Sequence, residues 1–261
     1  MSSDPNYEYR GLMAETWDLF RGDTSQWDDR AFYMQLISEY GQPVLDVGCG
    51  TGRLLLDYMQ QGMDVEGVDV SPEMIALCRS KAARLGLSPS IHQGTMETLA
   101  LPRAFRTIVV PSSSFQLLTD PADAQTAIRR LYDHLKPEGA LVMPFMILWK
   151  PGDPVETDWA QTGEKVRAED GAVVRRWSKA RYDPEAKLEH TQDRFEVRRE
   201  AAIVAREDHM RSPATRWYTQ EEAFRLYREA GFRKVIAYRE FQMEPAQPED
   251  MIFTVVGVRP A

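Results

Sequence analysis

Short apolar runs alternate with amphipathic stretches along the chain as far as residue 149. Apolar runs bounded by turn residues are typical of buried strands, and apolar residues three or four positions apart are typical of helices. We therefore expect strands at 43–47, 64–68, 90–93, 107–110 and 140–147, and helices at 27–40, 53–61, 72–85 and 121–135. Strands and helices that alternate at this spacing predict a parallel sheet covered by helices on both faces.

Two helix starts carry clear capping signals. Ser71 can cap a helix in which Pro72 is the first residue, because proline already has the backbone angle of that position. Thr219 and Glu222 have the spacing of a capping box, and Gly231 would end the helix that follows. A turn is expected at 136–139, where Lys, Pro, Glu and Gly follow one another.

The pattern changes after residue 149. Three β-like runs, at 172–182, 188–197 and 203–210, are separated by turn signals and predict an antiparallel meander. After the helix from Thr219, two further strands are expected at 235–238 and 252–258. We therefore divide the chain into an α/β domain, 1–149 and 213–261, whose first 40 residues form a helical lead-in, and a β-rich insertion at 150–212. That insertion is a candidate lid, substrate-binding surface or dimer surface.

The composition of the chain limits which partners and which cellular compartment we expect. The net charge of −8 disfavours a nucleic-acid backbone as the main partner. Cys49 and Cys78 are the only cysteines, too few for a disulfide framework, which favours a reducing cytoplasm. The longest apolar run, 140–149, is too short to cross a membrane. The polar, acidic first residues predict no secretory signal, and the four histidines lack the spacing of metal ligands.

A glycine-rich loop follows the first expected strand. Gly48, Gly50 and Gly52 alternate with other residues between that strand and the next helix, where positive φ or close approach of a ligand requires glycine. The loop amides and the start of the helix would face a bound group. Asp69 ends the second strand, where doubly wound folds commonly place an acid that binds a ribose. Together these residues predict a nucleoside site, although an ordinary turn with tolerated glycines would have the same sequence.

The spacing of the glycines distinguishes a dinucleotide site from a site for another nucleoside. The dinucleotide fingerprint requires glycine at position 53, which is Arg53, and Asp46 would oppose a pyrophosphate. An NAD(P)-dependent oxidoreductase is therefore disfavoured. The run D-x-G-x-G-x-G from Asp46 to Gly52 instead resembles motif I of the class I S-adenosylmethionine-dependent methyltransferases.

The resemblance covers residues 27–149 and 213–258 and implies the fold. It implies a Rossmann-like, doubly wound sheet of seven strands, mostly parallel, with its last strand antiparallel and the β insertion after strand 5. It also implies S-adenosylmethionine as cofactor. Thr95 stands where the family usually has an acid, so adenine recognition is expected to shift to Met96 and Glu97. The implied cofactor contacts are Trp17, Asp46, Gly48, Cys49, Gly50, Asp69, Val70, Met74, Thr95, Met96, Glu97 and Pro111.

The N-terminal aromatic segment resembles that of small-molecule N-methyltransferases, including glycine/sarcosine and amino-sugar enzymes. In those enzymes the segment closes over the cofactor, as Trp17 to Phe20 would here; the alternative is a helix that docks its aromatic residues on the core. Gln116 stands where amino-sugar enzymes often have histidine. The loop at 111–116 also lacks the Asn/Asp-Pro-Pro-Tyr/Phe signature of enzymes that methylate planar nitrogens of bases, which further disfavours nucleic acid.

The implied reaction is in-line transfer of a methyl group to a nitrogen or oxygen of a small polar molecule. Candidate residues beside the methyl group are Tyr9, Ser113 and Gln116. Candidate substrate contacts are Trp149, Arg216, Trp217 and Tyr218, although the last three would equally form a core strand. The alternative function is a non-catalytic S-adenosylmethionine-binding regulatory protein. A homodimer is possible in either case.

Overall fold

The central sheet has seven strands in the order β10-β11-β5-β4-β1-β2-β3 in the computed structural model, which describes residues 9–200 and 202–261. Strands β1 to β5 are parallel to one another, and β11 is antiparallel to both β5 and β10. The mostly parallel α/β sheet with an antiparallel last strand is therefore confirmed. Its strands are β1 (Val44–Val47), β2 (Val65–Asp69), β3 (Ser90–Gln93), β4 (Phe105–Val109), β5 (Leu135–Met146), β10 (Lys234–Arg239) and β11 (Ile252–Val258).

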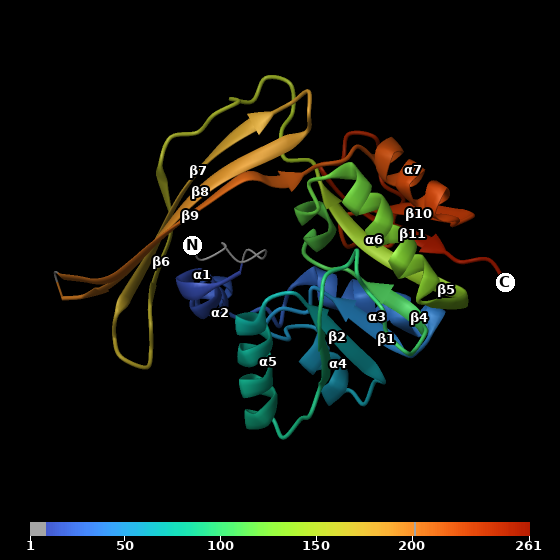
Figure 1. Cartoon of the computed structure of the whole chain (residues 1–261), viewed down its shortest axis with the longest axis horizontal. Coiled ribbons are helices and arrows are strands. Elements are labelled where there is room, and N and C mark those ends of the chain that lie inside the picture. The colour runs from blue at the N-terminus through green and yellow to red at the C-terminus, as the bar shows by residue number, and fades with distance from the viewer. Residues whose placement is uncertain (1–8, 201) are drawn as a thin grey trace.

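Helices cover both faces of this sheet (Figure 1). Successive side chains of a strand point to opposite faces, so that in β5 Leu141 joins one apolar cluster and Val142 the other. The first cluster includes buried residues of α6 (Pro121–Asp133) and α7 (Gln220–Ala230). The second includes residues of α3 (Asp28–Tyr40), α4 (Leu55–Gln60) and α5 (Pro72–Arg84). This is the doubly wound arrangement that places loops at the carboxyl ends of the strands.

The capping predictions are confirmed. The side chain of Ser71 accepts a hydrogen bond from the amide of Met74 at 3.1 Å, with Pro72 in the first turn. Thr219 and Glu222 form a reciprocal capping box.

Two local predictions are corrected. Helix α4 begins at Leu55, since residues 51–54 form the turn that carries the glycine loop into the helix. The expected turn at 136–139 lies within β5 as a bulge, because Phe105 pairs with Leu135 whereas Thr107 pairs with Ala140. A short 3-10 helix, η1 (Ser114–Leu117), also follows β4 where no element was expected.

The insertion forms a second sheet with the order β6-β7-β8-β9. Its strands, all antiparallel to their neighbours, are β6 (Ala160–Val166), β7 (Val173–Asp183), β8 (Leu188–Arg199) and β9 (Ala202–Arg216). The predicted meander is confirmed, but β6 was missed because its mostly polar, exposed residues give no apolar alternation. β9 continues to Arg216, four residues past the expected boundary at 212.

Two short helices lie between the sheets, α1 (Gly11–Glu15) and α2 (Trp17–Arg21) (Figure 1). Leu12, Leu19 and Phe20 pack on a small apolar cluster of the insertion that contains Val174 and Val197. The helical lead-in therefore contacts the insertion as well as the central domain. No helix among the described residues has the length and apolar character needed to span a membrane.

Candidate functional site

The glycine loop runs from the carboxyl end of β1 and is held against β2. The amide of Gly48 donates to the carbonyl of Val68 at 2.7 Å. Gly48 has φ +73°, and a Cβ at this position would lie 2.9 Å from Oγ of Ser114. The loop therefore requires glycine here, both for its backbone angle and for its close approach to η1.

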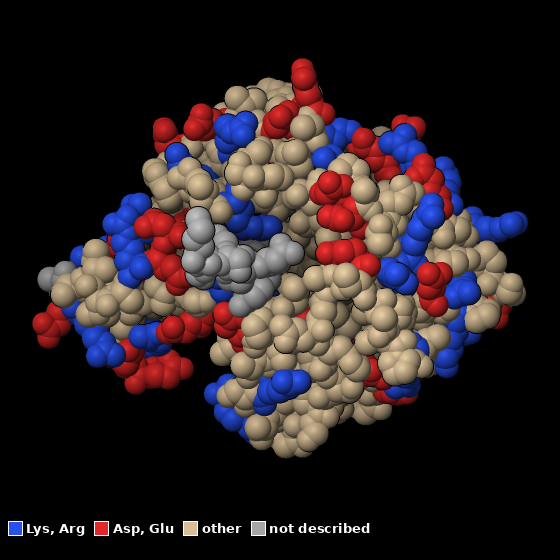
Figure 2. Space-filling model, viewed as in Figure 1, with Lys and Arg blue, Asp and Glu red and all other residues tan. Residues whose placement is uncertain are grey.

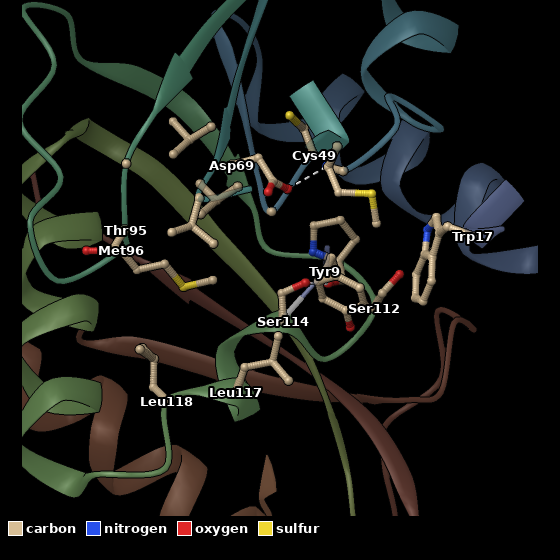
Figure 3. A pocket seen from close by; sticks show the side chains of 18 of the residues that line it. Tyr9, Trp17, Cys49, Asp69, Thr95, Met96, Ser112, Ser114, Leu117 and Leu118 are labelled. Carbon is tan, nitrogen blue, oxygen red and sulfur yellow. Dashed lines mark hydrogen bonds between the residues drawn. The ribbon is translucent and has the colours of Figure 1, made fainter. Parts of the chain in front are cut away.

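Asp69, at the end of β2, is fixed by backbone amides. Its carboxylate accepts hydrogen bonds from the amides of Gly50 at 2.7 Å and Ser71 at 2.9 Å. Burial nevertheless raises the pKa of Asp69, an effect that these hydrogen bonds oppose. The glycine loop and the end of β2 are thus joined into one rigid edge (Figure 3).

Asp46 is a buried carboxylate that lacks a partner. Neither of its oxygens has a hydrogen bond of normal geometry to the described residues. Burial, reinforced by the neighbouring charge of Asp69, raises the pKa of Asp46 to about 7 although Arg53 opposes the shift. Arg53 is itself bound in bidentate fashion by Asp29, at 2.9 and 2.5 Å. Because an unpaired buried carboxylate is costly, Asp46 suits a ligand that brings a positive charge.

A cavity of about 520 Å³ lies against these residues, in the size range of small-molecule sites. Every cofactor contact implied by the sequence lines it, and Figure 3 shows Trp17, Cys49, Asp69, Thr95 and Met96 around it. The full set is Trp17, Asp46, Gly48, Cys49, Gly50, Asp69, Val70, Met74, Thr95, Met96, Glu97 and Pro111. The structure therefore brings these positions together around one space.

Aromatic and cationic groups from the N-terminal helices form one wall of this cavity. The rings of Tyr9 and Trp17 meet edge to face at 4.8 Å between centroids. The guanidinium of Arg21 lies 4.5 Å from the centroid of the Trp17 ring, and its Nη2 donates to Oγ of Ser112 at 3.0 Å. Burial lowers the pKa of Arg21. Sequence reasoning missed Arg21, although its position one helical turn after Trp17 was a usable signal.

The N-terminal wall is tied to the central domain by polar contacts. Asp18 accepts a hydrogen bond from Oγ1 of Thr51 at 2.7 Å and pairs with Nζ of Lys81 at 2.7 Å. Oγ of Ser71 donates to the carbonyl of Tyr9 at 2.6 Å. The helices are thus fastened to the turn after the glycine loop and to the start of α5.

Strand β9 also contributes to the lining, which the sequence did not indicate. His209, Met210, Arg211 and Pro213 line the same cavity. The side chain of His209 is buried, and its Nε2 lies 3.0 Å from Oε1 of Glu207. The insertion therefore borders the cofactor cavity directly.

A second cavity of similar volume, about 520 Å³, adjoins the first. Tyr9, Ser112, Leu117 and Arg211 line both. The second cavity lies between the loop after β4, the end of β5 and one face of the insertion sheet. Figure 2 shows acidic and basic side chains interspersed over the face of the molecule in view.

Ser113 lines this second cavity in a strained loop. Ser112 and Ser113 both have positive φ, +56° and +57°. Two consecutive non-glycine residues in this region cost roughly 1–2 kcal/mol each. Such strain clusters at functional sites, and here it lies where the two cavities meet.

Gln116 also borders the second cavity, but its amide is fully used by backbone. Its Nε2 donates to the carbonyls of Met146 and Arg216, both at 2.9 Å, and its Oε1 accepts from the amide of Met146 at 2.7 Å. The buried Gln116 therefore joins the end of β5 to the end of β9. Its expected place beside the transferred methyl group stays a prediction.

The other substrate candidates lie outside both cavities. Arg216 donates to the carbonyls of Thr119 at 2.7 Å and Ala186 at 3.0 Å. Trp217 and Tyr218 are buried in the core, as the alternative interpretation of this run allowed. Nε1 of Trp149 donates to the carbonyl of Asp153 at 3.1 Å, within its own loop. These side chains thus have local structural contacts, and their role as substrate contacts stays a prediction.

Comparison with known proteins agrees with this architecture. Residues 44–139 match the family model described as a methyltransferase domain. The chain is 29% identical over 147 residues to dTDP-3-amino-3,6-dideoxy-alpha-D-glucopyranose N,N-dimethyltransferase of Streptomyces fradiae, an alignment that covers 54% of this chain and 56% of that protein. It is 24% identical over 243 residues to glycine/sarcosine N-methyltransferase of Aphanothece halophytica, over 90% of this chain and 83% of that protein.

A solved structure extends the likeness of fold to the whole chain. The sugar N-methyltransferase of Streptoalloteichus sp. superposes with a TM-score of 0.73 at 23% identity, covering 100% of this chain and 99% of that one. The chain spans about half the length of most of the curated relatives that it matches. Residues 44–139 are therefore a methyltransferase domain, and the chain around them has the fold of the S-adenosylmethionine-dependent methyltransferases.

Proposed function

We propose that this chain transfers the methyl group of S-adenosylmethionine to a nitrogen or oxygen of a small polar molecule. The observation that carries the proposal is the pair of adjoining cavities. One is lined by the glycine loop and the orphaned Asp46, and the other by polar residues of the insertion. A donor and an acceptor placed in them would meet beside Ser112 and Tyr9, which line both.

The residues of the first cavity fit the chemical groups of the cofactor. Asp46 would compensate the ammonium of its methionine part, and Asp69 would accept hydrogen bonds from the ribose hydroxyls. Arg21 supplies a cation for the carboxylate of the methionine part. Thr95, Met96 and Glu97 would border the adenine. The aromatic wall of Tyr9 and Trp17 would keep water from the transferred group.

The bound cofactor supplies a methyl group activated on a sulfonium, so the protein's own contribution is alignment and exclusion of water. Alignment of two reactants is worth roughly 7–11 kcal/mol of the barrier. The strained loop at Ser112 and Ser113 fixes the boundary at which acceptor and methyl group would face each other. The insertion at 150–212, together with the end of β9, would hold the acceptor.

A small acceptor is supported by the size of the second cavity and by the relatives named for amino-sugar and glycine/sarcosine methylation. The mixed charge of the surface and the net charge of −8 favour a small molecule over a nucleic acid. Cys49 and Cys78 are both free and buried, which suits a reducing cytoplasm. A homodimer through the insertion is compatible with this function.

The test is a calorimetric titration of the purified chain with S-adenosylhomocysteine, with NADH titrated in parallel. Binding of S-adenosylhomocysteine alone is expected. A second measurement follows transfer of tritium from methyl-labelled S-adenosylmethionine to a panel of small amines and alcohols. Absence of S-adenosylhomocysteine binding contradicts the proposal, and binding without any methylated product favours a regulatory binding protein.

A further inference from the structure

Three carboxylates line the second cavity, and they differ in what holds them. Asp193 is buried and bound by Nε and Nη2 of Arg176, at 3.0 and 2.7 Å, so its charge is paired within the protein. Asp158 is exposed and remains solvated. The third, Glu189, is half-buried on the middle strand β8.

Glu189 lies beside two neutral hydroxyl groups, those of Tyr182 and Thr215. In the sheet it lies directly opposite Tyr182 of β7 on one side and Thr215 of β9 on the other. Residues directly opposite one another place their side chains on the same face, and all three line the cavity. Both hydroxyls act on the Glu189 carboxylate and lower its pKa. The trio fixes one carboxylate on the face of the insertion that borders the second cavity.

Hydroxyls orient this carboxylate but do not neutralise it. Burial and the nearby charge of Asp193 raise the pKa of Glu189, while the two hydroxyls and the charge of Arg211 oppose the shift. The pKa of Tyr182 is raised as well, chiefly by burial. A partly desolvated carboxylate of this kind is stabilised by a cationic group or by a proton. Because Glu189 lines a cavity, a bound ligand can supply this cationic group or proton.

We propose that Glu189, oriented by Tyr182 and Thr215, binds the reacting nitrogen of the acceptor and accepts a proton from it, so that the methylated molecule is an amine. This inference rests on the proposed function. The ammonium would transfer one proton to the Glu189 carboxylate, and the freed lone pair would form the new C–N bond. The C–S bond electrons stay on sulfur, which gives a methylammonium product and S-adenosylhomocysteine. The proton on Glu189 then leaves to solvent.

The experiment compares matched amines and alcohols as acceptors of the labelled methyl group. The pairs are glucosamine and glucose, glycine and glycolate, and ethanolamine and ethylene glycol, each with the full-length chain at saturating S-adenosylmethionine. We expect transfer only to amines. Glu189→Gln should lower kcat/KM for the best amine at least 30-fold and remove the acidic limb of its pH profile. The Kd for S-adenosylhomocysteine should stay within twofold.

Two further variants separate this role from a structural one. Thr215→Val keeps the carboxylate but removes one of the two hydroxyls beside it, and should lower kcat/KM by about 3- to 10-fold while preserving the pH limb. Glu185→Gln, an exposed substitution of the same kind in the hairpin between β7 and β8, should leave kcat/KM unchanged. Circular dichroism and thermal melting verify that each variant is folded.

Each outcome decides between the alternatives. Transfer to an alcohol as fast as to its amine partner overturns the inference, as does a folded Glu189→Gln variant with kcat/KM within threefold of wild type. So does S-adenosylhomocysteine binding without transfer to any of the amines. Failure to bind S-adenosylhomocysteine at all instead overturns the proposed function, because Glu189 lies outside the cofactor cavity.

Discussion

The carboxylate of Glu207, on β9, accepts a hydrogen bond from the backbone amide of Leu12 in α1 at 2.6 Å. These residues are far apart in the sequence, yet their contact joins the two walls of the cofactor cavity. Gly11 makes the approach possible, since a Cβ at this position would overlap the Glu207 carboxylate. The N-terminal helices are thus held from the insertion side as well as from the central domain.

Gly11→Ala should therefore loosen the N-terminal wall. The added methyl group collides with Glu207, and φ of +51° is itself unfavourable for alanine. We expect the Kd for S-adenosylhomocysteine to rise roughly tenfold, equivalent to about 1.4 kcal/mol, and the bond after Arg10 to become more sensitive to trypsin. Gly22→Ala is the matched control, because φ there is +65° but the space around it is open. Equal effects in the two variants would contradict a role for the Glu207 contact.

Asp69→Ala should weaken cofactor binding by roughly 2–3 kcal/mol, which is about 30- to 150-fold in Kd. The variant loses the proposed acceptor of the ribose hydroxyls and the anchor of the Gly50 amide. Calorimetric titration with S-adenosylhomocysteine measures the loss. Asp64→Ala, just before the start of the same strand and largely exposed, provides the control. An unchanged Kd in Asp69→Ala removes this residue from the ribose site.

Cofactor affinity should depend on pH through Asp46. Its pKa of about 7 in the free protein means that half of the molecules carry a protonated carboxyl near neutrality. A ligand with an ammonium group favours the charged form, so the Kd for S-adenosylhomocysteine should fall as pH rises from 6 to 8. Asp46→Asn should bind weakly and with little dependence on pH over this range. A wild-type Kd that is flat with pH would count against the pairing.

The raised pKa of Asp46 also predicts how the stability of the ligand-free protein changes with pH. The pKa of Asp46 is raised above its ordinary value of 3.8. The stability that its protonation contributes is fully present below about pH 4 and is lost as pH rises through 7. Over that window the loss is roughly 3–5 kcal/mol. Urea unfolding at pH 5 and 8 should reveal the part of this loss that falls between those two values, roughly 2–3 kcal/mol for wild type, with a smaller difference for Asp46→Asn.

Gln116→Leu should destabilise the fold by roughly 2–4 kcal/mol, because it leaves the carbonyls of Met146 and Arg216 and the amide of Met146 without their buried partner. Thermal melting measures the effect. Gln125→Leu is the comparison, since its hydrogen bond to Glu229 is exposed, and it should change stability by no more than about 0.5 kcal/mol. Similar melting temperatures for the two variants would show that Gln116 does not clamp these strands.

The lining of the first cavity could be largely predicted from the sequence because its contributors follow strand ends. Gly48, Asp69 and Met96 lie in short loops at the same edge of the sheet, and a parallel sheet brings those loops together whatever else the chain does. The walls added by Arg21 and His209 depend on where the N-terminal helices and β9 pack, which no local pattern encodes.

The residues around the second cavity were less predictable, because their contacts also depend on how distant segments pack. Gln116 and Arg216 are polar residues near the expected cleft, and nothing in their immediate sequence shows that backbone carbonyls already bind them. Glu189 is one of many charged residues in a polar strand. Only the pairing of β7, β8 and β9 places it between Tyr182 and Thr215.

The hydrogen bonds by which Gln116 joins Met146 to Arg216 have a consequence for how such a molecule can evolve. The insertion leaves the central domain after Met146 and rejoins it at Arg216, and one side chain binds both points. The segment between them is a loop with closed ends, which can change in length or sequence without moving the strands that hold the cofactor. Acceptor preference can therefore diverge among descendants of this chain while the central sheet and its glycine loop are inherited unchanged, as long as the β9 residues that line the first cavity are kept.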